Sequence, residues 1–368
     1  MIDELLRRLA VAPVMGRFHP LLPLCLPPET DVQPAARTVA AAMDDLAPTV
    51  ARPILITAAD PAYADRFPVM DAPELPHAAP INEGLPRRLA AARSLLTQRG
   101  VAQRIAADTQ RRGYRTVVLL LVDGLSYEDT RHWLEAPEPV FVDGPTITYF
   151  AAADGRILPD VGFPAIVGRP PLAQRLAALG LGRARGYSYW DRQSNAVAAL
   201  MFDGMPLQRV GGITEALARL ADEPLDGLYV QIVRVGTDGL AHGRREVSAQ
   251  EVAATVEAVH EDLLRVVELL RRTELPGAAY LVSDHGLLWK HEHALLEVTG
   301  CRSDHPRYAA LPLAHDAPAT RFETEGATFS LFHYPHLGAP IRANNSGVHG
   351  GLSYWESIVP FVHIEVNL

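Results

Sequence analysis

The sequence predicts an α/β fold in which a mainly parallel sheet is sandwiched between helices. Three continuous apolar runs have the length and composition of strands that are buried on both faces, at Val117–Val122, Leu228–Val233 and Ala278–Val282. Between the last two runs, a predicted helix over Ala249–Arg272 carries apolar residues at helical spacing: Val252, Val256, Val259, Leu263, Val266 and Leu270. A strand, a long helix and a second strand are typical of the crossover that joins parallel strands.

The remaining segments are predicted on either side of these strands. Residues 1–110 form an accessory region that is expected to be mostly helical, with helices over Ala35–Leu46 and Leu85–Ala107 and a short strand over Pro53–Thr57. This region carries no catalytic pattern, so it either docks a protein partner or only covers the core sheet. Residues 111–368 are expected to form the core. Its further strands are predicted at Arg307–Pro312, Thr328–Tyr334 and Ile358–Val366.

Composition excludes several classes of function. The chain has 368 residues, a hydrophobic fraction of 48% and a formal net charge of −9, which argue for a packed core and against general nucleic-acid binding. Lys290 is the lone lysine and follows Trp289, so a phosphate-binding Walker loop is excluded. Two cysteines cannot form a thiolate metal cluster, and no apolar run is long enough for a membrane span. We expect a cytoplasmic protein.

Aspartates follow the three buried strands at their carboxyl ends: Asp123, Asp238 and Asp284. A single aspartate after a strand is common in turns and indicates little. In a parallel sheet, however, ligands bind in the crevice outside the carboxyl ends of the strands. Three like charges in a partly desolvated crevice are costly unless a cation neutralises them. The pattern therefore predicts a metal site.

Histidines extend this predicted site. His242 follows Asp238 by four residues, a spacing that places both side chains on one helical face, and His285 directly follows Asp284. His349 lies in a glycine-rich segment that allows close backbone approach. Carboxylate and imidazole ligands suit zinc, and also manganese. Six ligands exceed the need of one tetrahedral ion, so two ions are expected.

Two further features have open interpretations. His291, His293 and His305 follow the Ser-Asp-His-Gly segment closely and either line the pocket or support its ligands. The segment 186–195 (GYSYWDRQSN) concentrates aromatic residues in a chain with few of them. It either recognises a substrate by stacking or forms a buried turn.

The ordered motifs VDG (Asp123), DGLAH (Asp238 to His242), SDHG (Asp284, His285) and HGG (His349) resemble the alkaline phosphatase superfamily. The segments HPRY at 305–308 and HGGLSYWESIVPFV at 349–362 are most similar to its PglZ-domain branch, known from bacterial phage-defence systems. The resemblance covers roughly residues 115–368. It implies that Asp238, His242 and His349 hold one ion, and that Asp123, Asp284 and His285 hold the other together with a Ser or Thr nucleophile.

The nucleophile position departs from this pattern. The matching stretch, LPDVGFPAIVGRPP at 158–171, contains no hydroxyl side chain. Asp160 there is expected to act as a metal ligand, as an unusual carboxylate nucleophile or only as a helix cap. Thr146 and Thr148 are the nearest upstream hydroxyls, and Ser126 is another candidate that is expected to start a helix. Asp160 and Thr148 are the catalytic candidates of the sequence analysis.

The sequence thus predicts a two-metal hydrolase or transferase, similar to phosphatases and phosphodiesterases. Its substrate would be a small phosphate ester, sulfate ester or related anionic group. The missing hydroxyl favours either attack by water or a specialised reaction. The alternative is a catalytically altered PglZ-like scaffold that binds metal and acts in defence through protein partners, with residues 1–110 as the docking region.

Overall fold

The structure is a computed structural model of the chain. It describes residues 21–26, 52–57, 96–130, 132–142, 161–190, 196–292, 295–301, 303, 305–310, 313, 319–324, 327–332, 336–351 and 353–368. Both catalytic candidates, Asp160 and Thr148, lie outside the described residues, as do Thr146, His293 and the predicted helix Ala35–Leu46.

An eight-stranded mixed sheet forms the centre of the fold, with the order β3-β5-β17-β9-β4-β8-β6-β7. All neighbouring pairs are parallel except those of β17, which is antiparallel to both β5 and β9. The strands are β3 (Leu96–Thr97), β4 (Thr116–Asp123), β5 (Glu138–Phe141), β6 (Arg183–Ser188), β7 (Leu207–Arg209), β8 (Leu228–Val235), β9 (Gly277–Ser283) and β17 (Ile358–Val366). The predicted mainly parallel sheet is confirmed.

The three apolar runs form adjacent strands in the middle of this sheet. All eight residues of β4 and all seven of β9 are buried, as are the first six residues of β8. Because both faces of these strands are covered, each strand needs apolar side chains on both sides, and the sequence shows continuous rather than alternating hydrophobicity. β4 lies between β9 and β8, so their carboxyl ends meet at one edge of the sheet.

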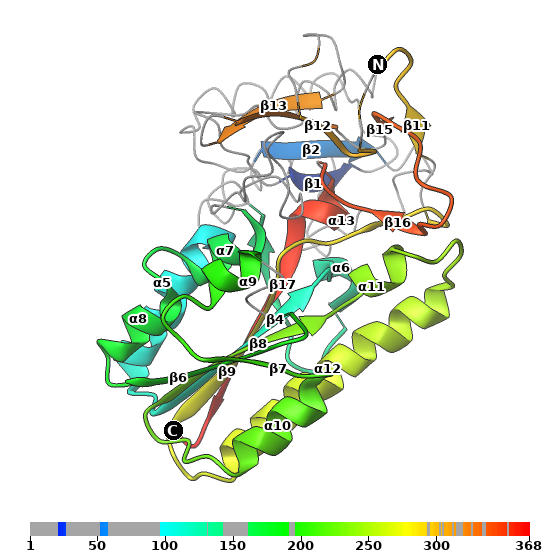
Figure 1. Cartoon of the computed structure of the whole chain (residues 1–368). Coiled ribbons are helices and arrows are strands. Elements are labelled where there is room, and N and C mark those ends of the chain that lie inside the picture. Colours follow the sequence, from blue (N-terminus) through cyan, green and yellow to red (C-terminus); the bar gives the residue numbers. More distant parts are fainter. Residues whose placement is uncertain are drawn as a thin grey trace.

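Helices cover both faces of the sheet (Figure 1). One face packs against α10 (Ile213–Ala221) and α12 (Ala249–Arg271), whose buried side chains belong to one apolar cluster. The opposite cluster takes its helical side chains from α5 (Gln98–Arg112), α7 (Gly162–Val167), α8 (Leu172–Ala177) and α9 (Ala196–Met201). Two sheet faces buried under separate helical layers are the expected sandwich.

The helix α12 matches its prediction closely. The Ser248 hydroxyl accepts a hydrogen bond from the backbone N–H of Glu251, and the Glu251 carboxylate accepts one from the backbone N–H of Ser248. This reciprocal capping box satisfies two N–H groups that the first helical turn leaves unpaired. The predicted apolar stripe is buried along its whole length. None of the helices in the described part of the chain is long and apolar enough to cross a membrane.

The amino-terminal elements differ in part from the prediction. The strand expected at Pro53–Thr57 is present as β2 (Arg52–Thr57), which pairs in parallel with β1 (Leu21–Leu26). The helix expected over Leu85–Ala107 differs from the structure within its described part, residues 96–107, and at its carboxyl end, while residues 85–95 lie outside the described residues. Thr97 is extended and pairs with β5, and the helix continues to Arg112, where Gly113 ends it in a left-handed conformation. Strand β3 and helix α5 therefore belong to the core, ahead of the expected boundary at residue 110.

Small sheets and short helices lie beyond the carboxyl edge of the main sheet (Figure 1). The strand expected at Thr328–Tyr334 is β14 (Ala327–Phe332), and Ile358–Val366 is confirmed as β17. Of the strand expected at Arg307–Pro312, Tyr308–Ala309 form β12, Arg307 and Ala310 lie outside it, and residues 311–312 are outside the described residues. The other elements are β10 (Leu288–Trp289), β11 (Leu296–Glu297), β13 (Ala319–Thr324), β15 (His336–Leu337), β16 (Gly347–Val348), α6 (Tyr127–Thr130), α11 (Asp238–Ala241) and α13 (Tyr354–Ser357).

Candidate metal centre

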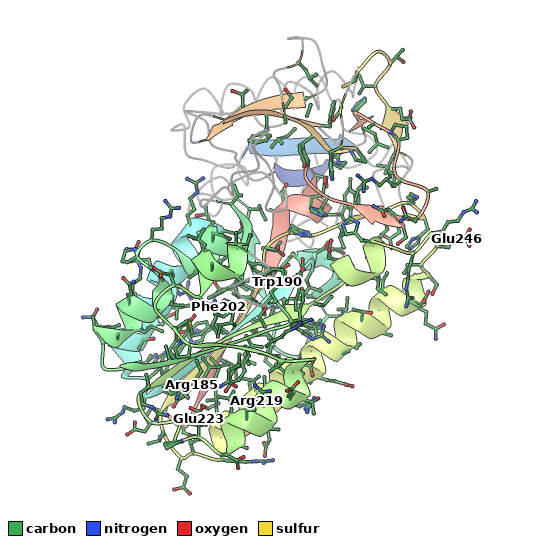
Figure 2. The ribbon with its side chains drawn as sticks, in the orientation of Figure 1. Arg185, Trp190, Phe202, Arg219, Glu223 and Glu246 are labelled. Atoms are coloured by element: carbon green, nitrogen blue, oxygen red, sulfur yellow. The ribbon has the colours of Figure 1, made fainter. Side chains whose placement is uncertain are left out.

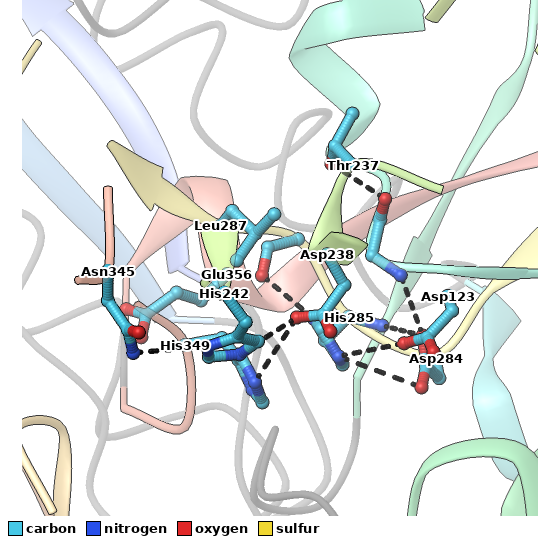
Figure 3. Close-up of polar contacts among 12 residues, drawn as sticks. Asp123, Thr237, Asp238, His242, Asp284, His285, Leu287, Asn345, His349 and Glu356 are labelled. Carbon is cyan, nitrogen blue, oxygen red and sulfur yellow. Dashed lines mark hydrogen bonds and ion pairs between the residues drawn. The ribbon is translucent and has the colours of Figure 1, made fainter. Parts of the chain in front are cut away.

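The three aspartates of the sequence pattern meet at the carboxyl edge of the sheet (Figure 3). Asp123 is the last residue of β4, Asp284 follows β9 directly, and Asp238 begins α11 three residues after β8 ends. Because β9, β4 and β8 are neighbours with parallel directions, the three carboxylates come from adjacent strand ends. The structure thus brings together the three carboxylates that the sequence analysis placed at one edge of the sheet.

The turn that carries Asp238 is bonded to the end of β4. The backbone N–H of Thr237 and its hydroxyl both donate to the Gly124 carbonyl, at 2.8 and 2.7 Å. Gly124 has φ of +75°, and a Cβ on it would lie 2.8 Å from the Cβ of Asp238. A side chain at this position would therefore force the two segments apart. Thr237, which the sequence analysis did not single out, holds Asp238 beside Asp123.

The first group of ligand atoms comprises Asp123, Asp284 and His285, whose donor atoms all lie within 4.8 Å of one another. The Nε2 atom of His285 lies 3.7 Å from Asp123 Oδ1 and 3.7 Å from Asp284 Oδ2. All three residues are buried. A Cβ on Gly286 would overlap the carbonyl oxygen of Trp355, so the position directly after His285 requires a glycine.

Two buried atoms of this first group lack a hydrogen-bond partner among the residues that the structure describes: Asp123 Oδ1 and His285 Nε2. The other ring nitrogen of His285 lies 3.1 Å from the carbonyl oxygen of Gly286, to which it can only donate. The proton of a neutral ring is then on Nδ1, and the Nε2 lone pair faces the two carboxylates. Buried polar atoms of this kind normally have a partner. A cation bound between Asp123, Asp284 and His285 would satisfy both unpartnered atoms, so these residues fit a metal ion.

The second group comprises Asp238, His242 and His349, again with donor atoms within 4.8 Å of one another. Asp238 Oδ1 lies 3.2 Å from His242 Nε2 and 3.6 Å from His349 Nε2. His349 is buried, whereas the His242 side chain is 41% exposed, so this group opens toward solvent. The side-chain amide of Asn345 lies 3.1 Å from His242 Nδ1 and orients the ring. Asn345 was missed by the sequence analysis.

The electrostatics of the two groups differ. Burial, followed by the charges of Asp284 and Asp238, raises the pKa of Asp123 well above its usual value. Burial likewise raises the pKa of Asp284 and lowers that of His285. Asp238 behaves in the opposite way, because its bond to His242 and the nearby histidine charges overcome burial and lower its pKa to about 2. The first group is thus costly to ionise without a cation.

A fully buried ion pair supports the loop that carries His349. The Arg307 guanidinium donates to both carboxylate oxygens of Glu356, at 3.0 and 2.8 Å, and both side chains are 0% exposed. Glu356 also accepts from the backbone N–H of Gly351 and from the Ser353 hydroxyl, at 3.0 and 2.6 Å. The HPRY segment and the HGGLSYWES segment therefore form one unit beneath His349, a link that the sequence does not reveal.

The start of α7 lies against the first group. A Cβ on Gly162, the first residue of α7, would lie 3.9 Å from the Cβ of Asp284. Asp160, two residues earlier, and Thr148 are outside the described residues, so their placement stays a prediction. The Ser126 hydroxyl donates to the Trp355 carbonyl at 2.8 Å and accepts from the Leu287 N–H at 3.2 Å, a structural use of its oxygen.

Two aromatic features of the sequence lie beside the centre. The Tyr189 hydroxyl, from the segment 186–195, donates to Asp123 Oδ2 at 2.5 Å. His305 stacks on Tyr308 with a centroid distance of 4.2 Å, and its ring centroid lies 6.3 Å from that of His349. The sequence analysis left the roles of the segment 186–195 and of His305 open. Tyr189 contacts the site directly, and His305 borders it, whereas His291 pairs with Glu292.

Comparison with known proteins gives a likeness at the level of solved structures. No family model and no curated protein matches the chain. Murine ectonucleotide pyrophosphatase/phosphodiesterase 5 is 14% identical, with a TM-score of 0.44, over 67% of this chain and 87% of that chain. An inactive form of it, in complex with AMP, has a TM-score of 0.45 at 13% identity, with the same shares covered. The C-terminal periplasmic domain of the phosphoethanolamine transferase EptC from Campylobacter jejuni is 11% identical, with a TM-score of 0.36, over 68% and 80%. The activity is argued below from the site itself.

Proposed function

We propose that the chain is a metal-dependent enzyme of the alkaline phosphatase superfamily that acts on a phosphate ester or a related anionic ester with two divalent ions. Asp123, Asp284 and His285 would hold one ion, and Asp238, His242 and His349 would hold the other. The observation that carries this proposal is the pair of buried, unpartnered atoms Asp123 Oδ1 and His285 Nε2, which lie 3.7 Å apart.

The separation of these two atoms supports a shared ligand role. A distance of 3.7 Å is too long for a hydrogen bond. Zinc–nitrogen and zinc–oxygen bonds of about 2.0–2.2 Å at a tetrahedral angle place two ligand atoms roughly 3.4 Å apart. The distance between His285 Nε2 and Asp284 Oδ2 has the same value of 3.7 Å. The atoms are thus spaced as ligands of one ion rather than as hydrogen-bond partners.

The tautomers of the histidines fit this role. A ligating imidazole usually donates its other N–H to a carbonyl or carboxylate oxygen. The Gly286 carbonyl is placed to accept from His285 Nδ1. The Asn345 amide can turn its oxygen toward Nδ1 of His242, which leaves Nε2 free beside Asp238. Zinc is the ion that we favour for such ligands, with manganese as the second choice.

When bound, such ions polarise the ester oxygen and stabilise negative charge on the attacking and leaving oxygens. The chain itself supplies the fixed geometry. Thr237 and Gly124 hold Asp238 against the end of β4, and the Arg307–Glu356 pair holds the His349 loop. Residue Gly162, beside Asp284, places the start of α7 at the first group. Rigid positioning of this kind lowers the entropic cost of bringing substrate and attacking group together.

The attacking group is also part of the proposal. We propose that Asp160 orients a water molecule for attack, because the stretch that precedes α7 contains no hydroxyl and its neighbour Gly162 adjoins Asp284. Asp160→Asn should then lower turnover by about 100-fold or more with metal still bound, and Thr148→Ala should change it little. The reverse pattern would assign the nucleophile to the threonine-containing segment 144–150.

The finer assignment to a PglZ-like bacterial branch rests on HPRY and HGGLSYWESIVPFV. The buried Arg307–Glu356 pair supports it, because it gives these two segments one common structural purpose. If turnover has been lost, the chain would instead be a metal-binding defence scaffold. Cytoplasmic location and partner docking through residues 1–110 stay predictions.

Turnover assays test the proposed function. The wild type, loaded with zinc or manganese, is assayed with bis(para-nitrophenyl) phosphate, para-nitrophenyl phosphate and para-nitrophenyl sulfate. The matched variants are Asp284→Asn, which removes a charge from the first group, and Asp262→Asn, which removes a largely buried carboxylate from α12. We expect the metal-loaded wild type to be active. Metal removal or Asp284→Asn should abolish this activity, whereas Asp262→Asn should retain it. Metal-loaded protein that turns over none of the three esters would support the scaffold instead.

A further inference from the structure

Tyr189 reaches the metal centre from a strand that is not a neighbour of β4. It follows the last residue of β6, and β8 lies between β6 and β4. Figure 2 shows Arg185 near the opposite end of the sheet and Trp190 toward the end at which the aspartates lie. The Tyr189 side chain extends past β8 toward the end of β4, and its hydroxyl donates to Asp123 Oδ2 at 2.5 Å.

The ring of Tyr189 is held by its neighbours. It contacts Trp190 with a centroid distance of 4.8 Å, and Trp190 in turn meets the buried Phe163 of α7 edge-on at 5.9 Å. The backbone N–H of Trp190 donates to the Ser188 hydroxyl at 3.0 Å, which fixes the turn after β6. A phenol carried by such a packed segment has few alternative positions, so its hydrogen bond to Asp123 is defined by the fold.

The two carboxylates of the first group are arranged alike. Asp284 Oδ1 accepts the backbone N–H groups of Gly124 and His285, at 3.1 and 3.0 Å, while its Oδ2 faces His285 Nε2. Asp123 Oδ2 accepts from Tyr189, while its Oδ1 faces the same Nε2 atom. Each carboxylate thus has one oxygen fixed by a donor and one directed at the place where an ion would be bound.

We infer that Tyr189 is a positioning residue for metal binding, which fixes one oxygen of Asp123 so that the other is presented to the ion of the first group. This inference rests on the proposed metal sites and goes beyond them, because it assigns a role to a residue that is not itself a ligand. Asp284 is fixed by the backbone, which no substitution removes. Asp123 depends on a side chain, so its orientation can be tested by mutation.

The expected size of the effect follows from other metal sites. Partners that orient a ligand by hydrogen bonding typically change metal affinity by about 10- to 100-fold when they are removed. Tyr189→Phe keeps the ring against Trp190 and removes only the hydroxyl. We therefore expect the affinity for one of the two ions to fall about 10- to 100-fold, and the affinity for the other ion, at Asp238, His242 and His349, to stay unchanged.

The chain offers a matched control in Tyr187. It lies on strand β6, is fully buried, and its hydroxyl has no hydrogen-bond partner in the described part of the chain. Tyr187→Phe therefore makes the same chemical change without touching the centre. Zinc is titrated calorimetrically into the metal-free wild type and into both variants, and the melting temperature of each metal-free protein is recorded. A titration of Tyr189→Phe combined with His349→Ala isolates the first ion.

The outcomes separate this inference from the proposed function. Selective weakening of one ion in Tyr189→Phe, with metal-free melting temperatures like those of Tyr187→Phe, supports it. Two ions bound with wild-type affinities in Tyr189→Phe would overturn it and leave the proposed function intact. Weakened metal binding in Tyr189→Phe, together with a wild type that turns over no ester, would support the inference and contradict the proposed enzyme activity. A wild type that binds no zinc overturns both.

Discussion

The imidazole rings of His285 and His349 stack face to face, with centroids 3.8 Å apart and planes inclined by 7°. Each ring belongs to a different group of candidate ligands. The two groups are therefore in direct contact through these rings and form one site rather than two separate ones. Ions held in both would act on the same substrate group, as two-metal chemistry requires.

Substitutions in the two groups should remove different ions. His349→Ala leaves the contacts among Asp123, Asp284 and His285 in place, so we expect the protein to retain one ion and lose the other. Asp123→Ala should remove the opposite ion. Native mass spectrometry of each variant and of the double variant measures this, with the exposed His132→Ala as control. Wild-type metal content in both single variants would show that the ligand assignment is wrong.

Asp284→Asn should stabilise the metal-free protein. Burial raises the folded-state pKa of Asp284 above its unfolded value, so the folded state binds more protons and its stability falls as pH rises through that interval. The amide oxygen of asparagine can still accept from the N–H groups of Gly124 and His285. At neutral pH the metal-free variant should melt above the metal-free wild type, and zinc should raise its melting temperature less. A lower melting temperature of the metal-free variant would contradict this account.

Metal affinity should fall on acidification in both groups, through different residues. In the first group, burial and the neighbouring carboxylates raise the pKa of Asp123, so protons compete with the ion. In the second, the Asp238 carboxylate raises the pKa of His242 while the pKa of Asp238 itself is low. Binding is therefore present above these pKa values and lost as pH falls through them, and the raised pKa of His242 moves the loss in the second group to a higher pH than an ordinary histidine would give. Zinc titrations between about pH 8 and pH 5 measure this, and a constant affinity would exclude both causes.

The Arg307–Glu356 pair should matter for stability as well as for the His349 loop. Glu356→Gln leaves a fully buried guanidinium without its counter-charge, and breaking such a pair costs about 3–5 kcal/mol. Glu257→Gln, which disturbs an exposed pair with His132, should cost no more than about 1 kcal/mol. Urea unfolding of the metal-free proteins compares them. Equal stability of the two variants would mean that the buried pair is dispensable.

The main sheet and the six clustered residues could be predicted because their signals are local. A strand buried on both faces leaves a continuous apolar run, and α12 shows a regular apolar stripe that begins after a capping box. The aspartates directly follow such runs, so strand order was enough to bring them together. Within the expected helix Leu85–Ala107, Leu96 and Thr97 are extended instead, because they pair with β5, and no local pattern contains that pairing.

The supporting residues could not be predicted, since each acts across a long sequence separation. Tyr189 bonds to a residue 66 positions away, Thr237 to one 113 positions away, and Asn345 to one 103 positions away. None of these residues carries a motif of its own. The aromatic segment 186–195 was noticeable in the sequence. Only the structure, in which β6 and β4 lie on either side of β8, shows that the hydroxyl of Tyr189 in this segment bonds to Asp123.

Metal content of the purified wild type tests the central claim most directly. Protein prepared without chelator is supplied with zinc or manganese, freed of excess ion by gel filtration, and analysed by inductively coupled plasma mass spectrometry alongside its protein concentration. Two ions per chain are expected, because two groups of carboxylates and imidazoles lie side by side, and Asp123 Oδ1 and His285 Nε2 are buried without a hydrogen-bond partner among the described residues. A protein that stays folded and retains neither zinc nor manganese would contradict the account.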